Sequence, residues 1–289
     1  MDRYLRGSPG VVVTEVDGLR QHRYLRRTLQ VSAQDGAHVE LTLDQYIQYF
    51  VEEVLDELIE KHTARAACAI VMRVRSGAIL AMASRPAYDL NDFSHATPDE
   101  LLNRGIAMVY EPGSTMKIVP IAAAIEDGVV STRTLINCEH GSWMHHGRLL
   151  GDHGHSYGIM PVEDVLKKSS NVGTAKISLM IGRERLYNYL RSFGLGQRLG
   201  VDLPGEEHGI LHPLSNWSGI SCSRIAIGQG IAVTPLQMLS VYNTIANDGI
   251  LMKPRVVKRV VADNGDELYV SALQELGRPI SPKTASIMR

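Results

Sequence analysis

The chain has 289 residues, of which 44% are hydrophobic and 21% are charged, a composition typical of a globular protein. Its net charge of -1 gives no sign of a surface for nucleic acid or anionic membranes, so we expect no nucleic-acid partner. The cysteines Cys68, Cys138 and Cys222 lie far apart in the sequence, which excludes a disulfide framework and a CxxC metal site.

The first elements are predicted from capping and hydrophobic patterns. Residues 1 to about 40 are polar, with short apolar runs and frequent glycine, which predicts an irregular or β-rich lead-in. A helix is predicted after Thr42, because Thr42-Leu43-Asp44-Gln45 has the pattern of a capping box and apolar residues then recur at helical spacing. Residues 67–74 and 78–84 predict a β-hairpin. Since both runs are apolar at nearly every position, we expect helices on both faces of their sheet.

The second half of the chain is mostly helical in pattern. One helix is predicted to begin at Thr234-Pro235-Leu236-Gln237, which combines a cap, a proline at the first helical position and a capping-box glutamine. The glycine of Asp248-Gly249 ends it. A polar hairpin is predicted for residues 255–270, with its turn at residues 263–266. Ser281-Pro282 marks the start of a last helix.

The segment from Tyr110 to Lys117 carries the first candidate catalytic residues. Ser114 and Lys117 are three residues apart, so they share one face of a helix. A serine hydroxyl becomes a good nucleophile when a neighbour removes its proton, and a lysine can do so if burial or nearby cations lower its pKa. If Pro112-Gly113 leads into the helix, the amides at its N-terminus favour negative charge beside Ser114. The alternative is a surface helix with solvated side chains, and Pro120 is expected to kink or end that helix.

A second candidate motif, Ser169-Ser170-Asn171, lies between two predicted helices. A turn of this kind can direct a hydroxyl that relays a proton, and a carboxamide that both donates to and accepts from a peptide bond, into one cleft. These residue types also cap helices routinely, and capping is compatible with catalysis because it fixes a rotamer. We expect the active-site cleft to lie between this turn and the start of the Ser114 helix.

With these two motifs, the sequence resembles the class B penicillin-binding proteins, the monofunctional transpeptidases of bacterial cell division and elongation. The S-x-x-K motif corresponds to Ser114–Lys117, preceded by Tyr110-Glu111-Pro112-Gly113, and the S-x-N motif to Ser169–Asn171. Further similar stretches are Leu41–Gln45, Ile79–Pro86, Phe193–Gly196, Leu203–Glu206, Gly228–Gly230 and Thr234–Gln237. The resemblance covers nearly the whole chain and favours the cell-division branch. It implies an α+β fold of the β-lactamase/transpeptidase type, with an antiparallel sheet flanked by helices on both faces.

The resemblance also implies a role for each motif residue. Ser114 corresponds to the nucleophile that forms the acyl-enzyme, and Lys117 to its general base. Ser169 corresponds to the proton relay to the leaving amine, and Asn171 to a residue that binds the donor peptide. The implied reaction is attack on the D-Ala-D-Ala bond of a peptidoglycan stem peptide, loss of the terminal D-Ala and acyl transfer to an amine of a neighbouring strand. β-Lactams would acylate the same serine, a glycosyltransferase and other division or elongation proteins are the implied partners, and no cofactor is implied.

The third motif of the family, K-T-G, is missing. Lys283-Thr284-Ala285 resembles it, but it follows the helix start at Ser281-Pro282, and only four residues remain after it. We therefore expect a fragment in which residues 1–40 are a linker from an upstream domain and residues 41–289 form a transpeptidase domain truncated at its C-terminus. Its sheet should be incomplete, with an unpaired edge and uncovered apolar faces.

The isolated 289-residue chain is consequently expected to be a poor or inactive catalyst, because a missing K-T-G lysine deprives Lys117 of a cation that helps to lower its pKa. Labelling with a fluorescent penicillin measures this directly. Stoichiometric acylation of Ser114 in the isolated chain would contradict the expectation.

The sequence contains no apolar stretch long enough for a membrane span, and its polar N-terminus lacks the pattern of a signal peptide. The family resemblance nevertheless implies a parent protein that is anchored in the bacterial cytoplasmic membrane, with its catalytic domain outside. Residues 138–155 contain five histidines, with Cys138 and Asp152 as further possible zinc ligands. Because their spacing matches no standard zinc pattern, we expect a solvated, flexible loop and no metal site.

Two other functions remain open. A serine β-lactamase or β-lactam sensor would share the fold and Ser114, but a hydrolase needs a base that activates water against the acyl-ester, and the sequence offers no candidate. Turnover of a chromogenic cephalosporin by the full-length protein would reveal a hydrolase. A non-catalytic role in a division complex is consistent with the missing K-T-G strand. The DNA downstream of Arg289 would test it, since an in-frame K-T-G motif restores the transpeptidase.

Overall fold

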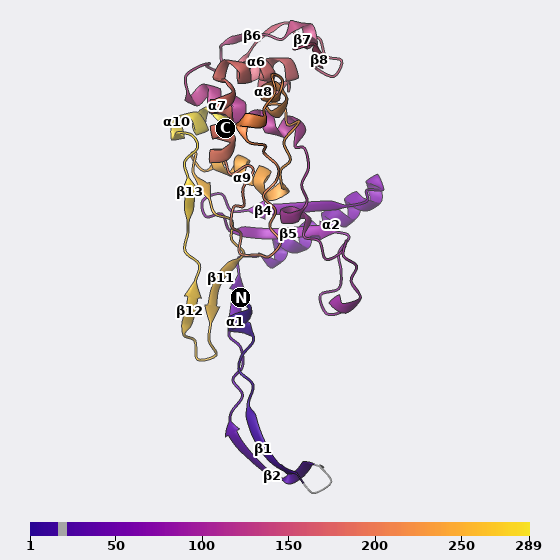
Figure 1. Ribbon diagram of the computed structural model, residues 1–289, viewed down its shortest axis with the longest axis vertical. Coiled ribbons are helices and arrows are strands. Elements are labelled where there is room, and N and C mark those ends of the chain that lie inside the picture. Colours follow the sequence, from indigo (N-terminus) through magenta and orange to yellow (C-terminus); the bar gives the residue numbers. More distant parts are fainter. Residues whose placement is uncertain (17–21) are drawn as a thin grey trace. The chain divides into compact units, whose positions relative to one another are not determined.

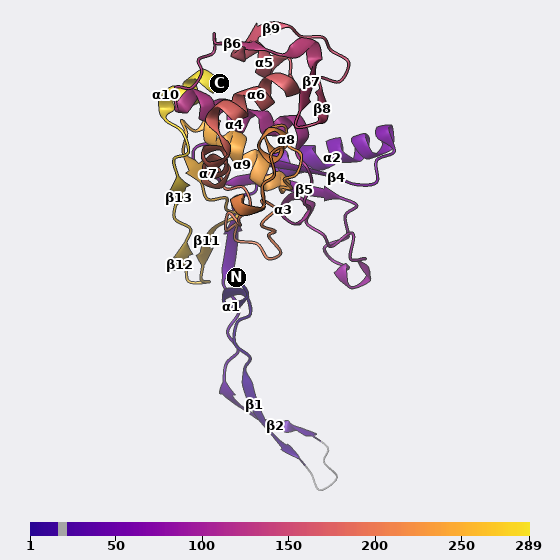
Figure 2. The same cartoon turned by 45° about the horizontal axis from the view of Figure 1, so that its top comes forward.

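The computed structural model describes residues 1–16 and 22–289, and the chain forms two compact units. The first unit consists of residues 1–42 and 257–272, and the second of residues 43–256 and 273–289. The course of the chain through each unit can be followed in Figures 1 and 2. Residues 17–21 of the predicted lead-in lie outside the described residues.

The first unit is built mainly from strands. Its elements are α1 (Asp2–Leu5), β1 (Val11–Val16), β2 (His22–Val31), β3 (His38–Leu41), β11 (Val257–Val261) and β12 (Glu267–Val270). β11 is the middle strand of an antiparallel sheet, with β12 on one side and β3 on the other. β11 and β12 confirm the predicted polar hairpin. The pairing with β3, in which Val260 lies opposite Val39, was not predicted, because it joins segments far apart in the sequence.

The second unit combines helices with short antiparallel strand pairs. Its α-helices are α2 (Gln45–His62), α3 (Arg104–Ala107), α4 (Ile118–Glu126), α5 (Val162–Lys167), α6 (Asn171–Ile181), α7 (Arg183–Ser192), α8 (Ser221–Ile225), α9 (Pro235–Ala246) and α10 (Pro282–Met288). Its strands are β4 (Ala67–Met72), β5 (Ile79–Arg85), β6 (Leu135–Asn137), β7 (Ser142–His145), β8 (Arg148–Gly151), β9 (Ile159–Pro161), β10 (Leu251–Met252) and β13 (Glu275–Gly277). This mixture confirms the predicted α+β class.

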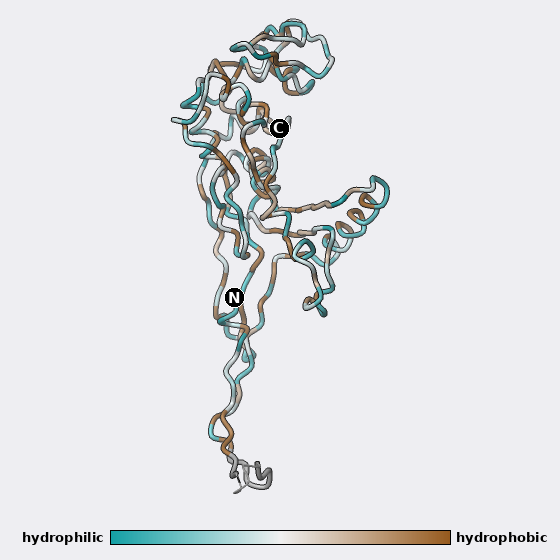
Figure 3. Tube along the Cα trace, turned by 45° about the vertical axis from the view of Figure 1, so that its right-hand side comes forward, coloured by the Kyte–Doolittle hydropathy of each residue, from teal (hydrophilic) through white to brown (hydrophobic). Residues whose placement is uncertain are grey.

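The helix predicted after Thr42 is α2, but its N-cap is Asp44. The Asp44 carboxylate accepts hydrogen bonds from the backbone N–H groups of Tyr46 (3.0 Å) and Ile47 (3.2 Å). The predicted capping box at Thr42 is therefore wrong, because an aspartate two residues later satisfies the first free N–H groups instead. Along α2 the trace alternates between hydrophobic and hydrophilic residues (Figure 3), as expected for an amphipathic helix.

The predicted apolar hairpin is confirmed by β4 and β5, and α2, α3 and α9 all contact it. β4 pairs with β5, and no other strand among the described residues pairs with its free edge. Beside this edge, an apolar pocket of about 420 Å³ is lined by Phe50 and Leu58 of α2 and by Cys68 of β4. An unpaired edge beside uncovered apolar surface is what the sequence predicted for this hairpin.

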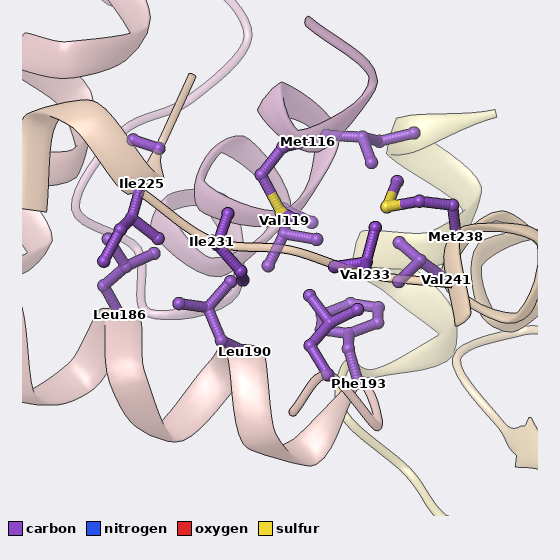
Figure 4. Packing of buried hydrophobic residues seen from close by; sticks show 14 of the residues in the cluster. Met116, Val119, Leu186, Leu190, Phe193, Ile225, Ile231, Val233, Met238 and Val241 are labelled. Carbon is purple, nitrogen blue, oxygen red and sulfur yellow. The ribbon is translucent and has the colours of Figure 1, made fainter. Parts of the chain in front are cut away.

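A hydrophobic core lies between α4, α7, α8 and α9 (Figure 4). Met116, Val119, Leu190 and Phe193 are completely buried in it. Met116 belongs to a 3-10 helix, η2 (Gly113–Lys117), that leads directly into α4. Because close packing of a core tolerates little movement, the buried Met116 side chain fixes the position of the segment that carries Ser114.

Two predicted helices near the C-terminus are confirmed. In α9, the Gln237 N–H donates to Thr234 Oγ1 (3.1 Å) and the Thr234 N–H donates to Gln237 Oε1 (2.9 Å), which completes the capping box. In α10, Ser281 Oγ accepts from the Thr284 N–H (3.2 Å). Lys283-Thr284-Ala285 therefore lies in a helix and forms no K-T-G strand. In the part of the chain that the structure describes, no helix has both the length and the apolar character of a membrane span.

Candidate active site

The Ser114 segment is one turn of 3-10 helix, η2, continued by the α-helix α4. Ser114 is exposed at the beginning of this turn, whereas Lys117 at its end is buried, with 1% of its surface exposed. Pro120 was predicted to kink or end the helix, and it does not end it: α4 continues to Glu126. Pro120 is the third residue of α4, in the first turn, where a missing N–H is tolerated because such groups have no partner within the helix.

The Lys117 amine makes direct contact with the second motif. Its Nζ donates hydrogen bonds to the backbone carbonyl oxygen of Ser169 and to the Ser169 hydroxyl oxygen (2.9 Å). Burial lowers the pKa of Lys117 from 10.5 to about 8, and the negative charge of Asp152 partly opposes this shift. About half of this amine is therefore neutral near pH 8 and roughly one in ten at pH 7, so the neutral form that a general base requires is accessible.

The Ser169-Ser170-Asn171 turn connects α5 to α6, as predicted. Ser169 has a left-handed backbone conformation (φ 56°), and Ser170 is the N-cap of α6, accepting from the Gly173 N–H (2.9 Å). Asn171 is the first residue of α6, and its Nδ2 donates to the carbonyl oxygen of Gly151 (2.8 Å). Ser170 is therefore the residue that caps α6, and the Ser169 hydroxyl remains available for its contact with Lys117.

The Asp152 side chain holds this turn in place, a role that no sequence pattern indicated. Its buried carboxylate accepts hydrogen bonds from Ser170 Oγ (2.8 Å), from the Asn171 N–H (2.6 Å) and from the Val172 N–H (3.0 Å). It therefore satisfies N–H groups of the first turn of α6, where a negative charge is also favourable. The sequence indicated Asp152 only as a possible zinc ligand, because no local sequence pattern relates it to a turn 18 residues away.

The Ser114 segment is anchored on its other side by the loop before α9. Glu111 Oε1 accepts from the Gly230 N–H (2.7 Å), and the Gly113 N–H donates to the Gly228 carbonyl oxygen (3.2 Å). Gly228 has a left-handed conformation (φ +77°), and a Cβ atom there would lie 2.2 Å from the Gly113 carbonyl oxygen. The close approach of these two backbone segments therefore requires glycine at position 228.

Replacing Gly228 with alanine is expected to destabilise the chain by about 2–4 kcal/mol, because the added methyl group overlaps the Gly113 backbone in a conformation already unfavourable for alanine. Urea unfolding measures the change. Gly230→Ala is a matched control, since Gly230 has a similar φ of +73° but open space where its Cβ would lie. Equal decreases in the free energy of unfolding of the two variants would show that overlap with Gly113 does not cause the destabilisation.

The structure thus brings the two predicted motifs together through Lys117 and Ser169, with Asn171 on the same turn. The Ser114 hydroxyl makes no hydrogen bond to any residue that the structure describes, and it is open to solvent. The arrangement places an exposed hydroxyl and a buried amine of low pKa on one short turn, next to a second hydroxyl.

The histidine-containing segment is more ordered than the predicted flexible loop. Residues 142–151 form the hairpin β7–β8, in which Trp143 pairs with Leu150. The His145 ring stacks on the Trp143 ring, with centroids 4.4 Å apart. Among the described residues, no group of three His, Cys, Asp or Glu side chains is arranged to hold a metal ion. The predicted loop is therefore wrong for residues 142–151, because backbone pairing makes them a hairpin. The predicted solvation is confirmed for His140, His146, His153 and His155, which are exposed.

Comparison with known proteins covers most of the chain, including both motifs. A profile of the penicillin-binding protein transpeptidase domain matches residues 67–289, which include both motifs. The chain belongs to the penicillin-binding protein transpeptidase family. This confirms the family that the two motifs indicated.

The similar proteins are class B members of this family. Penicillin-binding protein PbpB of Mycolicibacterium smegmatis is 38% identical over 99% of this chain and 43% of its own length. The peptidoglycan D,D-transpeptidase FtsI of Escherichia coli is 31% identical over 89% of this chain and 43% of its own length. The crystal structure of penicillin-binding protein 3 from Mycobacterium tuberculosis with ampicillin has a TM-score of 0.83 and 37% identity, over 90% of this chain and 57% of that one. The chain spans less than half the length of these two curated relatives.

Proposed function

We propose that this chain contributes the catalytic centre of a peptidoglycan D,D-transpeptidase that works through an acyl-enzyme on Ser114. The observation that carries the proposal is the buried Lys117 amine, whose pKa is lowered to about 8 on the same turn as the exposed Ser114 hydroxyl. The names of the relatives support the reaction: FtsI of Escherichia coli is a peptidoglycan D,D-transpeptidase, and penicillin-binding protein 3 of Mycobacterium tuberculosis was crystallised with a β-lactam.

The hydrogen bonds of Lys117 suit it to the role of general base. A neutral amine has two N–H groups and one lone pair, and both donor directions of Lys117 are directed at Ser169. The lone pair is then free to accept the proton of Ser114 as its oxygen attacks the D-Ala-D-Ala carbonyl carbon. The C–N bond breaks with departure of D-Ala, whose nitrogen takes up a proton through the Ser169 hydroxyl.

Asn171 is proposed to bind the donor peptide. Its Nδ2 already donates one hydrogen bond to Gly151, which orients the carboxamide and leaves Oδ1 as an acceptor for a peptide N–H. Acyl transfer to an amine of a neighbouring strand would complete the cross-link. A glycosyltransferase and other division or elongation proteins are proposed partners. We also propose that the protein is held at the bacterial cytoplasmic membrane with this domain outside.

The proposal is tested by fluorescent penicillin labelling of the full-length natural protein. We expect one label per molecule, located on Ser114 by peptide mass spectrometry, and no label in Ser114→Ala. Ser192→Ala is the control, because Ser192 is an exposed serine at the end of α7. A label on another serine, or equal labelling of the Ser114→Ala variant, would refute the acyl-enzyme on Ser114.

The rate of Ser114 acylation is expected to rise with pH and to reach half of its maximum near pH 8. The reactive form contains neutral Lys117, and its lowered pKa means that at pH 7 roughly one amine in ten is neutral. An amine with an ordinary pKa of 10.5 would give a rate that still rises steeply above pH 9. Stopped-flow measurement of penicillin acylation between pH 6 and 9.5 distinguishes the two, and a flat profile would exclude Lys117 as the base.

A further inference from the structure

A polar pocket of about 450 Å³ lies beside the active-site segments, and both of its charged residues are arginines. Its polar lining consists of Arg148, Ser218, Ser221, Arg224, Gln229 and Gly230. Ile220 and Ile225 supply apolar surface, and no aspartate or glutamate is among the described residues that line it. A pocket with two guanidinium groups and no carboxylate of its own is suited to an anionic ligand.

Neither guanidinium group forms an ion pair with a carboxylate of the described residues. Arg224 donates to Gln229 Oε1 (3.0 Å) and to the Leu149 carbonyl oxygen (3.3 Å), both uncharged acceptors. The Arg148 side chain makes no hydrogen bond or ion pair with any residue that the structure describes. A guanidinium group has five N–H donors, so both side chains keep donors for a ligand. Burial lowers the pKa of the nearby His145, and the charge of Arg224 adds to this lowering.

The pocket is connected to both catalytic motifs. On one side, its residue Gly230 donates to Glu111 Oε1 (2.7 Å), three residues before Ser114. On the other side, Arg148 begins β8, and the last residue of that strand, Gly151, accepts from Asn171 Nδ2 (2.8 Å). β8 and α8, which carry the two arginines, lie side by side in Figures 1 and 2, and Arg224 bonds across to Leu149 of β8. A ligand in this pocket therefore contacts segments that are hydrogen-bonded to both catalytic motifs.

We propose that Arg148 and Arg224 bind a carboxylate of the peptide substrate, at a subsite separate from the reacting bond. This inference rests on the proposed transpeptidase function, whose substrates are peptides with carboxylates as their anionic groups. Two guanidinium groups can hold a carboxylate with paired, charge-assisted hydrogen bonds. The hydroxyls of Ser218 and Ser221 are hydrogen-bonded to each other (3.2 Å), so this pair keeps one O–H group as a neutral donor. The carboxylate belongs to either the donor peptide or the acceptor peptide, and the experiment separates these two sources.

The test uses the full-length natural protein and two pairs of synthetic peptides. The members of each pair differ only in one free carboxylate or its primary amide. The donor peptides end in D-Ala-D-Ala, and their reaction is measured as the release of D-alanine. The acceptor peptides carry the attacking amine, and their reaction is measured as the formation of the cross-linked product. We expect kcat/KM about tenfold higher for the carboxylate form in one pair. The preference should vanish in Arg148→Gln and Arg224→Gln and persist in part in Arg148→Lys, which keeps the charge but not the paired donors.

Arg198→Gln is the matched control, since Arg198 is an exposed arginine outside the pocket and its removal changes the net charge equally. Fluorescent penicillin labelling of Ser114 serves as the test of the proposed function in every variant. A preference in the donor pair assigns the carboxylate to the donor, and one in the acceptor pair assigns it to the acceptor. Labelling of Ser114 without a preference in either pair, or a preference that survives both glutamine variants, would overturn the inference and leave the transpeptidase function standing. If Ser114 of the unmodified protein is not labelled, the proposed function fails and the inference fails with it.

Discussion

Replacing Lys117 with methionine in the full-length natural protein is expected to slow acylation of Ser114 by a fluorescent penicillin about 10²–10⁴-fold, the range over which a general base accelerates a reaction. Methionine has a similar length but neither charge nor lone-pair nitrogen, so the variant removes the base and preserves most of the packing beside Met116. Lys117→Arg should be equally slow, because a guanidinium group stays protonated at every accessible pH. The measurement is the acylation rate at pH 8, near the pKa of Lys117.

The unfolding temperature of the Lys117→Met variant distinguishes loss of the general base from misfolding. At pH 7 the amine is largely charged and buried, which is unfavourable, so Lys117→Met is expected to unfold at no lower temperature than the unmodified protein. The pKa falls from 10.5 in the unfolded chain to about 8 in the folded one, so the unfolded chain binds more protons between these values. Stability from this group accordingly rises with pH across that range. Lys167→Met, at an exposed lysine of α5, is the matched control and should acylate normally. Normal acylation of Lys117→Arg would remove Lys117 from the mechanism.

Replacing Asp152 with alanine in the full-length natural protein is expected to lower its stability by about 3 kcal/mol or more and to abolish its penicillin labelling. The change leaves the N–H groups of Asn171 and Val172 without their acceptor, and each buried donor without a partner costs about 1–3 kcal/mol. It also frees the Ser170 side chain, which caps α6. The turn that presents Ser169 to Lys117 would then lose its fixed geometry. Urea unfolding and the labelling rate measure the two effects.

Two further variants identify the cause. Asp152→Asn keeps a carbonyl acceptor and removes the negative charge that raises the pKa of Lys117. We therefore expect a smaller loss of stability and a midpoint of the pH–rate profile shifted below that of the unmodified protein. Asp164→Ala removes a partly exposed aspartate paired with Lys168 (3.5 Å) and should cost less than about 1 kcal/mol. If Asp152→Ala were as mild as Asp164→Ala, the carboxylate would have no structural part in the turn.

The sequence by itself determined the features whose causes are local. The capping box of α9 and the cap of α10 were predicted correctly, because cap and bonded N–H lie within three residues of one another. The apolar β4–β5 hairpin and the position of the Ser169–Asn171 turn were likewise evident from short patterns. The same kind of pattern placed the cap of α2 at Thr42, and it failed there because Asp44 offered an equivalent oxygen two residues later.

Tertiary structure alone decided how the site is assembled. The pairing of β3 with β11, the support of the 169–171 turn by Asp152 and the close approach of Gly228 to Gly113 all join residues that are remote in the sequence. Burial of Lys117, which lowers its pKa, also depends on the whole core that surrounds α4. Residue types and spacing can name the groups that are able to react. Their protonation and mutual distances follow from packing and long-range hydrogen bonds, which no local pattern encodes.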